Sequence, residues 1–268
     1  MSHQALQRTL VRLLHDPTLV ERLRESGPTA LDEPELTENE RGWLAATDPR
    51  AFQTDPYRQG RILTSLVEEL PTAAALAARR LEGGLTSFFS SEHFHQAVRQ
   101  DRALRLAFAE LLEQTGSDTR ALVAIERGLM QARRAESPLE GEIYPAHGVL
   151  WISTPAGALE LYEALWAGLS RTGMPVVESV LKVAQAPLPV TSLDNDDRRT
   201  LLIEPDETGG FRVGEIPSGL EAILRAARDH RSLRACEEAA VRSGADATEA
   251  QEIIADLTSE GLLVCKVG

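Results

Sequence analysis

The sequence predicts an α+β protein, with an all-helical domain over residues 1–137 followed by an α/β domain over residues 146–268. Three observations predict this division. Apolar residues in the first half recur with a helical period and without any strand pattern. Pro138, Gly141 and Pro145 interrupt the chain between the halves, and β-type runs appear only after them. A chain of 268 residues is long enough for two domains that each bury a core.

Helix start and stop signals place the elements of the first half. Asp16 followed by Pro17 begins one helix, and Gly27 ends it. Thr37 and Glu40 form a capping box ahead of a short helix that carries Trp43. Further helices are predicted over 4–14, 57–70, 72–80, 92–98, 103–113 and 121–135. The segment 136–145 is the predicted domain boundary.

The next region mixes the two periods. Residues 147–152 form a β-type run, and 159–169 carry helical periodicity. The segment 176–184 is interpreted as a strand or a helix, since its Val-rich composition fits a strand that leads into a helix as well as a helix alone. Residues 186–197, with two prolines, form a linker. We expect this region to extend the sheet of the module that follows it.

The last module covers residues 198–268. Two β-type runs at 200–204 and 211–216 flank a turn-rich link, which predicts a hairpin. Helices follow over 218–228 and 232–242, and Asp246 with Glu249 caps a third helix. A short apolar run at 262–265 closes the module. This order of elements is that of a winged-helix-like module.

The charge of the third helix argues against DNA as its partner. This helix carries Glu249, Glu252, Asp256 and Glu260 and has no Lys or Arg. A recognition helix lies among phosphate oxygens and needs cations there. The chain as a whole has a net charge of −13. The sequence therefore predicts no nucleic-acid partner and no anionic membrane partner.

No catalytic or metal motif is apparent. His93 and His95 point about 200° apart on a helix and cannot share one ion, and we interpret the histidines as surface or capping residues. No Ser lies in a nucleophile elbow. Cys236 and Cys265 lie in apolar surroundings and are expected to be core residues. The chain is therefore expected to be non-enzymatic and cytoplasmic, without a cofactor or metal of its own.

The strand pair and three helices resemble the PqqD-like recognition module of systems that modify ribosomal peptides. In that module the leader of a precursor peptide adds a strand to a sheet edge beside the third helix. The resemblance implies a peptide-binding site on one strand and one helix. Its residues are Phe211, Arg212, Val213, Gly214, Glu215, Ile216, Ile253, Ile254 and Leu257.

The first half adds a second resemblance. The run Tyr57-Arg58-Gln59-Gly60-Arg61, with Phe88-Phe89 about thirty residues on, resembles the partner subunits of multinuclear non-haem iron-dependent oxidases of methanobactin-like and thiaglutamate-like pathways. The aromatic pair also fits ordinary core packing. The resemblance implies a non-catalytic subunit that presents a precursor peptide to an oxidase, which holds the iron. The alternative is a winged-helix adaptor or transcriptional regulator that acts through protein contacts.

Overall fold

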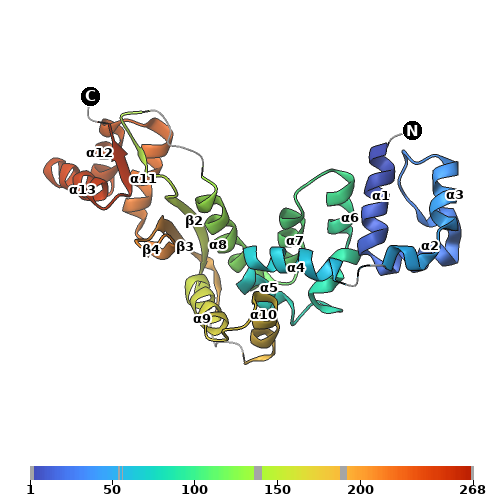
Figure 1. Cartoon of the computed structure of the whole chain (residues 1–268). Coiled ribbons are helices and arrows are strands. Elements are labelled where there is room, and N and C mark those ends of the chain that lie inside the picture. Colours follow the sequence, from blue (N-terminus) through green and yellow to red (C-terminus); the bar gives the residue numbers. More distant parts are fainter. Residues whose placement is uncertain (1–2, 54, 56, 136–140, 188–191, 267–268) are drawn as a thin grey trace. The chain divides into compact units, whose positions relative to one another are not determined.

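A computed structural model describes residues 3–53, 55, 57–135, 141–187 and 192–266 (Figure 1). Contacts divide the chain into a helical unit, Met1–Val123 with Leu165–Leu188, and a mixed unit, Ala124–Ala164 with Pro189–Gly268. These units do not coincide with the ranges 1–137 and 146–268. One reason is α10 (Val176–Gln185), which is a helix throughout, so that the helix alternative for this segment holds. It packs on α4 and α5 of the helical unit.

The predicted boundary lies partly outside the described residues, since 136–140 and the linker residues 188–191 are not described. The helical unit is built from helices alone in its described part. Its elements are α1 (His3–His15), α2 (Pro17–Ser26), η1 (Gly27–Ala30), α3 (Glu38–Ala46), η2 (Pro49–Gln53), α4 (Arg58–Glu69), α5 (Pro71–Ala77), η3 (Gly84–Ser90), α6 (Glu92–Arg99), α7 (Leu104–Glu113), the first part of α8 (Ser117–Arg133), the last part of α9 (Ala158–Ser170) and α10.

Local signals begin and end these helices as predicted. The Asp16 side chain accepts a hydrogen bond from the Thr18 backbone, and Pro17 takes the first turn of α2. Gly27 ends α2 with a φ of 64°, a left-handed value that glycine adopts without strain. Both halves of the capping box between Thr37 and Glu40 are present in α3. Each signal acts within four residues, so the sequence alone is sufficient to place it.

Aromatic rings form the centre of the helical unit. Phe88 and Phe89 are fully buried, and their ring centroids lie 5.5 Å apart. Phe94 and Phe108 pack edge-on against Phe88 at 5.6 and 5.2 Å. Such edge-to-face contacts add to the free energy of burial. The Phe88-Phe89 pair therefore serves the core of this unit.

The mixed unit combines antiparallel strands with helices. Its elements are the second part of α8, β1 (Ile143–Pro145), β2 (Leu150–Ala156), the first part of α9, β3 (Asp194–Pro205), β4 (Phe211–Ile216), α11 (Ser218–His230), α12 (Leu233–Arg242), α13 (Ala247–Ser259) and β5 (Leu263–Cys265). All pairings between these strands are antiparallel, so the expected α/β domain is an α+β unit in a mixed α+β chain.

A three-stranded sheet in the order β2-β3-β4 is covered on both faces. On one face Gly128 of α8 lies against Ile203, and an added Cβ at Gly128 would lie 2.5 Å from the Ile203 Cδ1 atom. On the other face α11 crosses the sheet, where Glu221 accepts a hydrogen bond from Thr200 at 2.6 Å. The predicted 147–152 run contributes β2, so this region extends the hairpin's sheet as expected.

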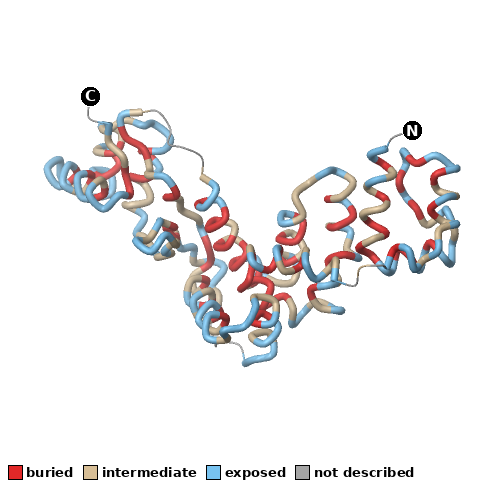
Figure 2. The backbone as a smooth tube through the Cα atoms, viewed as in Figure 1, coloured by how far each residue is buried: buried red, intermediate tan, exposed pale blue. Residues whose placement is uncertain are grey.

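The final strand does not join that sheet. β5 pairs with β1, from Ile143↔Cys265 to Pro145↔Leu263, and it packs against α13. The short strand expected at the end of the module is therefore present, with β1 as its partner. Strand partners across more than a hundred residues are set by the tertiary fold and not by local pattern. Figure 2 shows exposed residues along α12 and α13. Ile143 and Tyr144 of β1 and Leu263 of β5 are buried.

Candidate functional site

One free sheet edge of the mixed unit is the outer edge of β4. β4 pairs with β3 from Thr200↔Ile216 to Pro205↔Phe211 without a register shift. It is the last strand in the sheet order, and no other strand of the described residues pairs with its second edge. An edge of this kind presents a row of unpaired N–H and C=O groups that another chain can join.

The hairpin fixes which residues of β4 point outward. The Asp206 N–H donates to the Gly210 carbonyl at 3.0 Å, so Asp206 and Gly210 form a hydrogen-bonded pair of the ladder. Hydrogen-bonded and non-hydrogen-bonded pairs alternate along an antiparallel ladder. Arg212, Gly214 and Ile216 therefore direct their backbone groups toward β3. The N–H and C=O groups of Phe211, Val213 and Glu215 point to the free edge.

The side chains of β4 serve different purposes. Phe211 packs over Gly148, where an added Cβ would lie 3.2 Å from the ring. Arg212 is exposed and pairs with Glu204 on β3 at 2.7 Å. Ile216 packs at the margin of the core formed with α11. The edge thus combines anchored side chains with free backbone groups.

The three predicted residues of α13 lie elsewhere. Ile254 and Leu257 are 4% and 7% exposed and belong to the core shared with α11 and α12, while Ile253 is partly buried against it. The principal neighbours of α13 are α12 and β5, and β4 is not among them. The expectation that α13 flanks the strand edge therefore does not hold. Its apolar face is occupied by the core of its own unit.

The mixed unit also holds most of the chain's excess acidic charge. It contains 12 Lys and Arg against 22 Asp and Glu, whereas the helical unit contains 16 against 19. Glu252, Asp256 and Glu260 on the outside of α13 are exposed. Like charges at this density repel anionic partners and attract cationic ones. The unit therefore favours a basic ligand.

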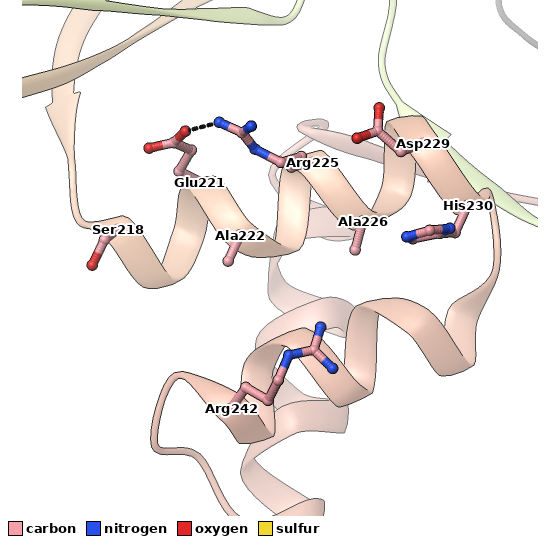
Figure 3. Close-up of a pocket in the computed structure, with 8 residues that line it drawn as sticks. All are labelled: Ser218, Glu221, Ala222, Arg225, Ala226, Asp229, His230 and Arg242. Carbon is pink, nitrogen blue, oxygen red and sulfur yellow. Dashed lines mark hydrogen bonds and ion pairs between the residues drawn. The ribbon is translucent and has the colours of Figure 1, made fainter.

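A shallow pocket lies on the outer side of α11, where α12 ends (Figure 3). It has a volume of about 380 Å³. Glu221 and Arg225 form an ion pair along α11, and Arg242 reaches toward α11 from the last turn of α12. Its lining is Ser218, Glu221, Ala222, Arg225, Ala226, Asp229, His230 and Arg242. Two carboxylates and two guanidinium groups nearly balance, so the pocket has no strong preference for either sign of charge.

Sequence reasoning missed a buried polar network in the helical unit. His95 Nδ1 accepts from Arg12 Nε at 2.9 Å, and its Nε2 therefore carries the proton that it donates to Asp16 Oδ2 at 2.9 Å. Ser90 also donates to Asp16, at 2.8 Å. The interpretation of His95 as a surface or capping residue is wrong, since its side chain is 5% exposed and that of Asp16 is fully buried.

This network lies in the interior of the helical unit and stabilises the fold. Although burial alone would raise it, hydrogen bonds from His95, Thr18 and Ser90 lower the pKa of Asp16 to about 2. The carboxylate therefore stays charged and joins α1, α2 and α6. No local motif announces it, because its partners lie 79 and 83 residues apart along the chain. Only the Asp16 cap could be found from the sequence.

Cys236 is buried and Cys265 is partly buried, and both thiols are free. Burial raises the pKa of the Cys236 thiol to about 11, so this residue is an inert part of the core. Within the described ranges no group of three or more His, Cys, Asp or Glu is arranged to hold a metal ion. Nor does any helix in these ranges have the length and apolar character needed to cross a membrane.

Comparisons with known proteins add no relative to these observations. No protein-family model matches the chain, and no curated protein matches its sequence.

Proposed function

We propose that this chain binds an extended peptide by strand addition at the free edge of β4. One observation supports the proposal above all. The backbone N–H and C=O groups of Phe211, Val213 and Glu215 point away from β3 and have no partner strand in the described residues. A guest strand would satisfy these groups with backbone hydrogen bonds, and side chains on alternate faces would set its register. The fixed hairpin register keeps this edge ordered before the guest arrives.

The resemblance noted from the sequence narrows the proposal. The guest is the leader of a ribosomally made precursor peptide, and the partner is an iron-dependent oxidase that modifies it in the cytoplasm. This chain is then a non-catalytic recognition subunit without a cofactor of its own. Holding the leader raises the effective concentration of the reactive segment at the oxidase. Co-expression with a neighbouring oxidase, followed by co-purification, tests this partnership.

A winged-helix adaptor or regulator that acts through protein contacts is the second candidate. Helices α11 to α13 pack in sequence order around one core, which supports it. The exposed carboxylates of α13, with no Lys or Arg on that helix, favour a basic protein over a nucleic acid. A basic protein that binds the wild-type chain and the Val213→Pro variant equally well would favour this candidate over strand addition.

The Val213→Pro variant tests the free edge. Proline removes an outward N–H group and leaves the ladder to β3 intact, because the Val213 N–H does not point to β3. Peptides selected from a random phage-displayed library on the wild-type chain are titrated by calorimetry. We expect Val213→Pro to weaken their binding roughly tenfold or more.

Two controls make this result specific. Arg234→Ala changes an exposed side chain on α12 and leaves β4 unchanged, so it should preserve the affinity. Circular dichroism and thermal unfolding check that Val213→Pro retains its fold. Unchanged affinity in a folded Val213→Pro variant, or no peptide enriched on the wild-type chain, would overturn strand addition at β4.

A further inference from the structure

Gly214 leaves a notch in the middle of the free edge. An ideal Cβ at this position would meet no atom within 4 Å, and the backbone is not left-handed there. Gly214 lies opposite Leu202, which lies opposite Trp151, so all three share the face toward α11. Neither a turn nor close packing requires glycine here. In an edge strand such a glycine marks a place where another group can approach the backbone.

The ladder phase defines what a guest places over this notch. An antiparallel guest continues the antiparallel sheet and forms the slightly more stable pairing. Its residue opposite Gly214 lies in a non-hydrogen-bonded pair, in which side chains are closest. An aromatic ring across from a glycine covers the exposed backbone and compensates for the missing side chain. The notch therefore favours an aromatic residue of the guest.

Glu215 sets the preference at the next position. Its side chain is exposed and has no ion-pair or hydrogen-bond partner among the described residues. The charge of Glu215 helps to raise the pKa of Arg199, but Arg199 forms its ion pair with Asp197, at 2.7 Å. A guest residue directly opposite Glu215 points to the same face, where an opposite charge stabilises the pair. The acidic excess of the mixed unit acts in the same direction.

We propose that the guest strand carries a Lys or Arg opposite Glu215, followed directly by an aromatic residue opposite Gly214. The order follows from antiparallel pairing, in which the guest runs from Glu215 toward Val213. This inference rests on strand addition at β4 and names the chemistry of the peptide that the edge selects. The basic residue and the aromatic residue point to opposite faces of the extended sheet.

The test uses a library of random peptides displayed on phage, selected separately on the full wild-type chain and on single variants. On the wild-type chain we expect enrichment of a basic residue followed by an aromatic one. Glu215→Lys should replace the basic residue by Asp or Glu at the same position. Gly214→Val fills the notch with a residue that favours strands. It should therefore remove the aromatic preference while the chain stays folded by circular dichroism.

Titration of one selected peptide makes the expectation quantitative. Changing its aromatic residue to Ala should lower affinity about threefold to fivefold on the wild-type chain, and by much less on Gly214→Val. The same preferences on the wild-type chain and on both variants would overturn the inference. If Val213→Pro still abolishes binding in that case, strand addition stands without this specificity. If Val213→Pro binds normally, both proposals fail.

Discussion

The two units of this chain differ in where their ion pairs and polar networks lie. In the helical unit Arg12, His95 and Asp16 are buried and form one chain of hydrogen bonds through His95. In the mixed unit ion pairs such as Arg234–Glu238 are largely exposed, although Glu126 of α8 is buried. A buried network holds elements together in one arrangement, whereas exposed charges act on partners. Under the proposed function the helical unit is the scaffold and the mixed unit carries the binding surface.

The two units also differ in how many backbone N–H and C=O groups lack a hydrogen-bond partner within the fold. The helical unit satisfies most of its backbone groups within helices and caps. The mixed unit leaves one edge of β4 open, and the exposed charges of Arg212 and Glu215 on that strand oppose pairing with another copy of the chain. An edge that is protected in this way admits a guest of complementary charge more readily than a second identical edge.

The largest effect should come from removing the buried carboxylate. Asp16→Ala leaves the buried His95 without the carboxylate that it bonds and removes the cap of α2, while Arg12 keeps its ion pair with Asp32, so we expect about 2–5 kcal/mol of destabilisation. Urea unfolding measures it. Glu238→Ala in the mixed unit is the matched control. It removes an exposed i,i+4 pair and should cost less than about 0.5 kcal/mol. Similar losses for the two variants would contradict the contrast between the units.

Acid should weaken the helical unit through the same residue. Asp16 has a folded pKa of about 2 against an ordinary value of 3.8. A lowered carboxyl pKa gives stability that is fully present above about pH 5 and is lost as the pH falls toward 2. The shift corresponds to about 2 kcal/mol. Unfolding followed from pH 5 to pH 2.5 should show this slope, and it should flatten in Asp16→Asn. A slope unchanged in that variant would assign the acid sensitivity to other carboxylates.

The smallest effect compares two capping boxes. Asp246 caps α13 through the Thr248 and Glu249 backbone, and Thr37 caps α3 through that of Glu40. Because both caps act locally, Asp246→Ala and Thr37→Ala should each cost about 1 kcal/mol in urea unfolding. Equal losses of unfolding free energy would show that the two units differ in how their charged residues are buried and paired, and not in their helix caps. A loss of several kcal/mol at either site would contradict this.

Local elements of the fold could be predicted well from the sequence. The strand from Phe211 to Ile216 has the predicted bounds, and both capping boxes form. The sequence left the segment 176–184 open between strand and helix, because Val-rich residues favour strands but also suit a helix that packs one face on other helices. For the proposed site, the sequence predicted the strand 211–216 but not which of its backbone groups face the free edge. The outward phase of Val213 required the hairpin bond between Asp206 and Gly210.

By itself the sequence determined where helices and strands begin and end, because caps, turns and periodicity act over a few neighbouring residues. It also determined the acidic balance of the chain. Only the tertiary structure decided that β5 joins β1 and not the hairpin, that α13 buries its apolar face away from β4, and that His95 meets Asp16. These outcomes depend on which distant surfaces fit together, and no local pattern specifies that.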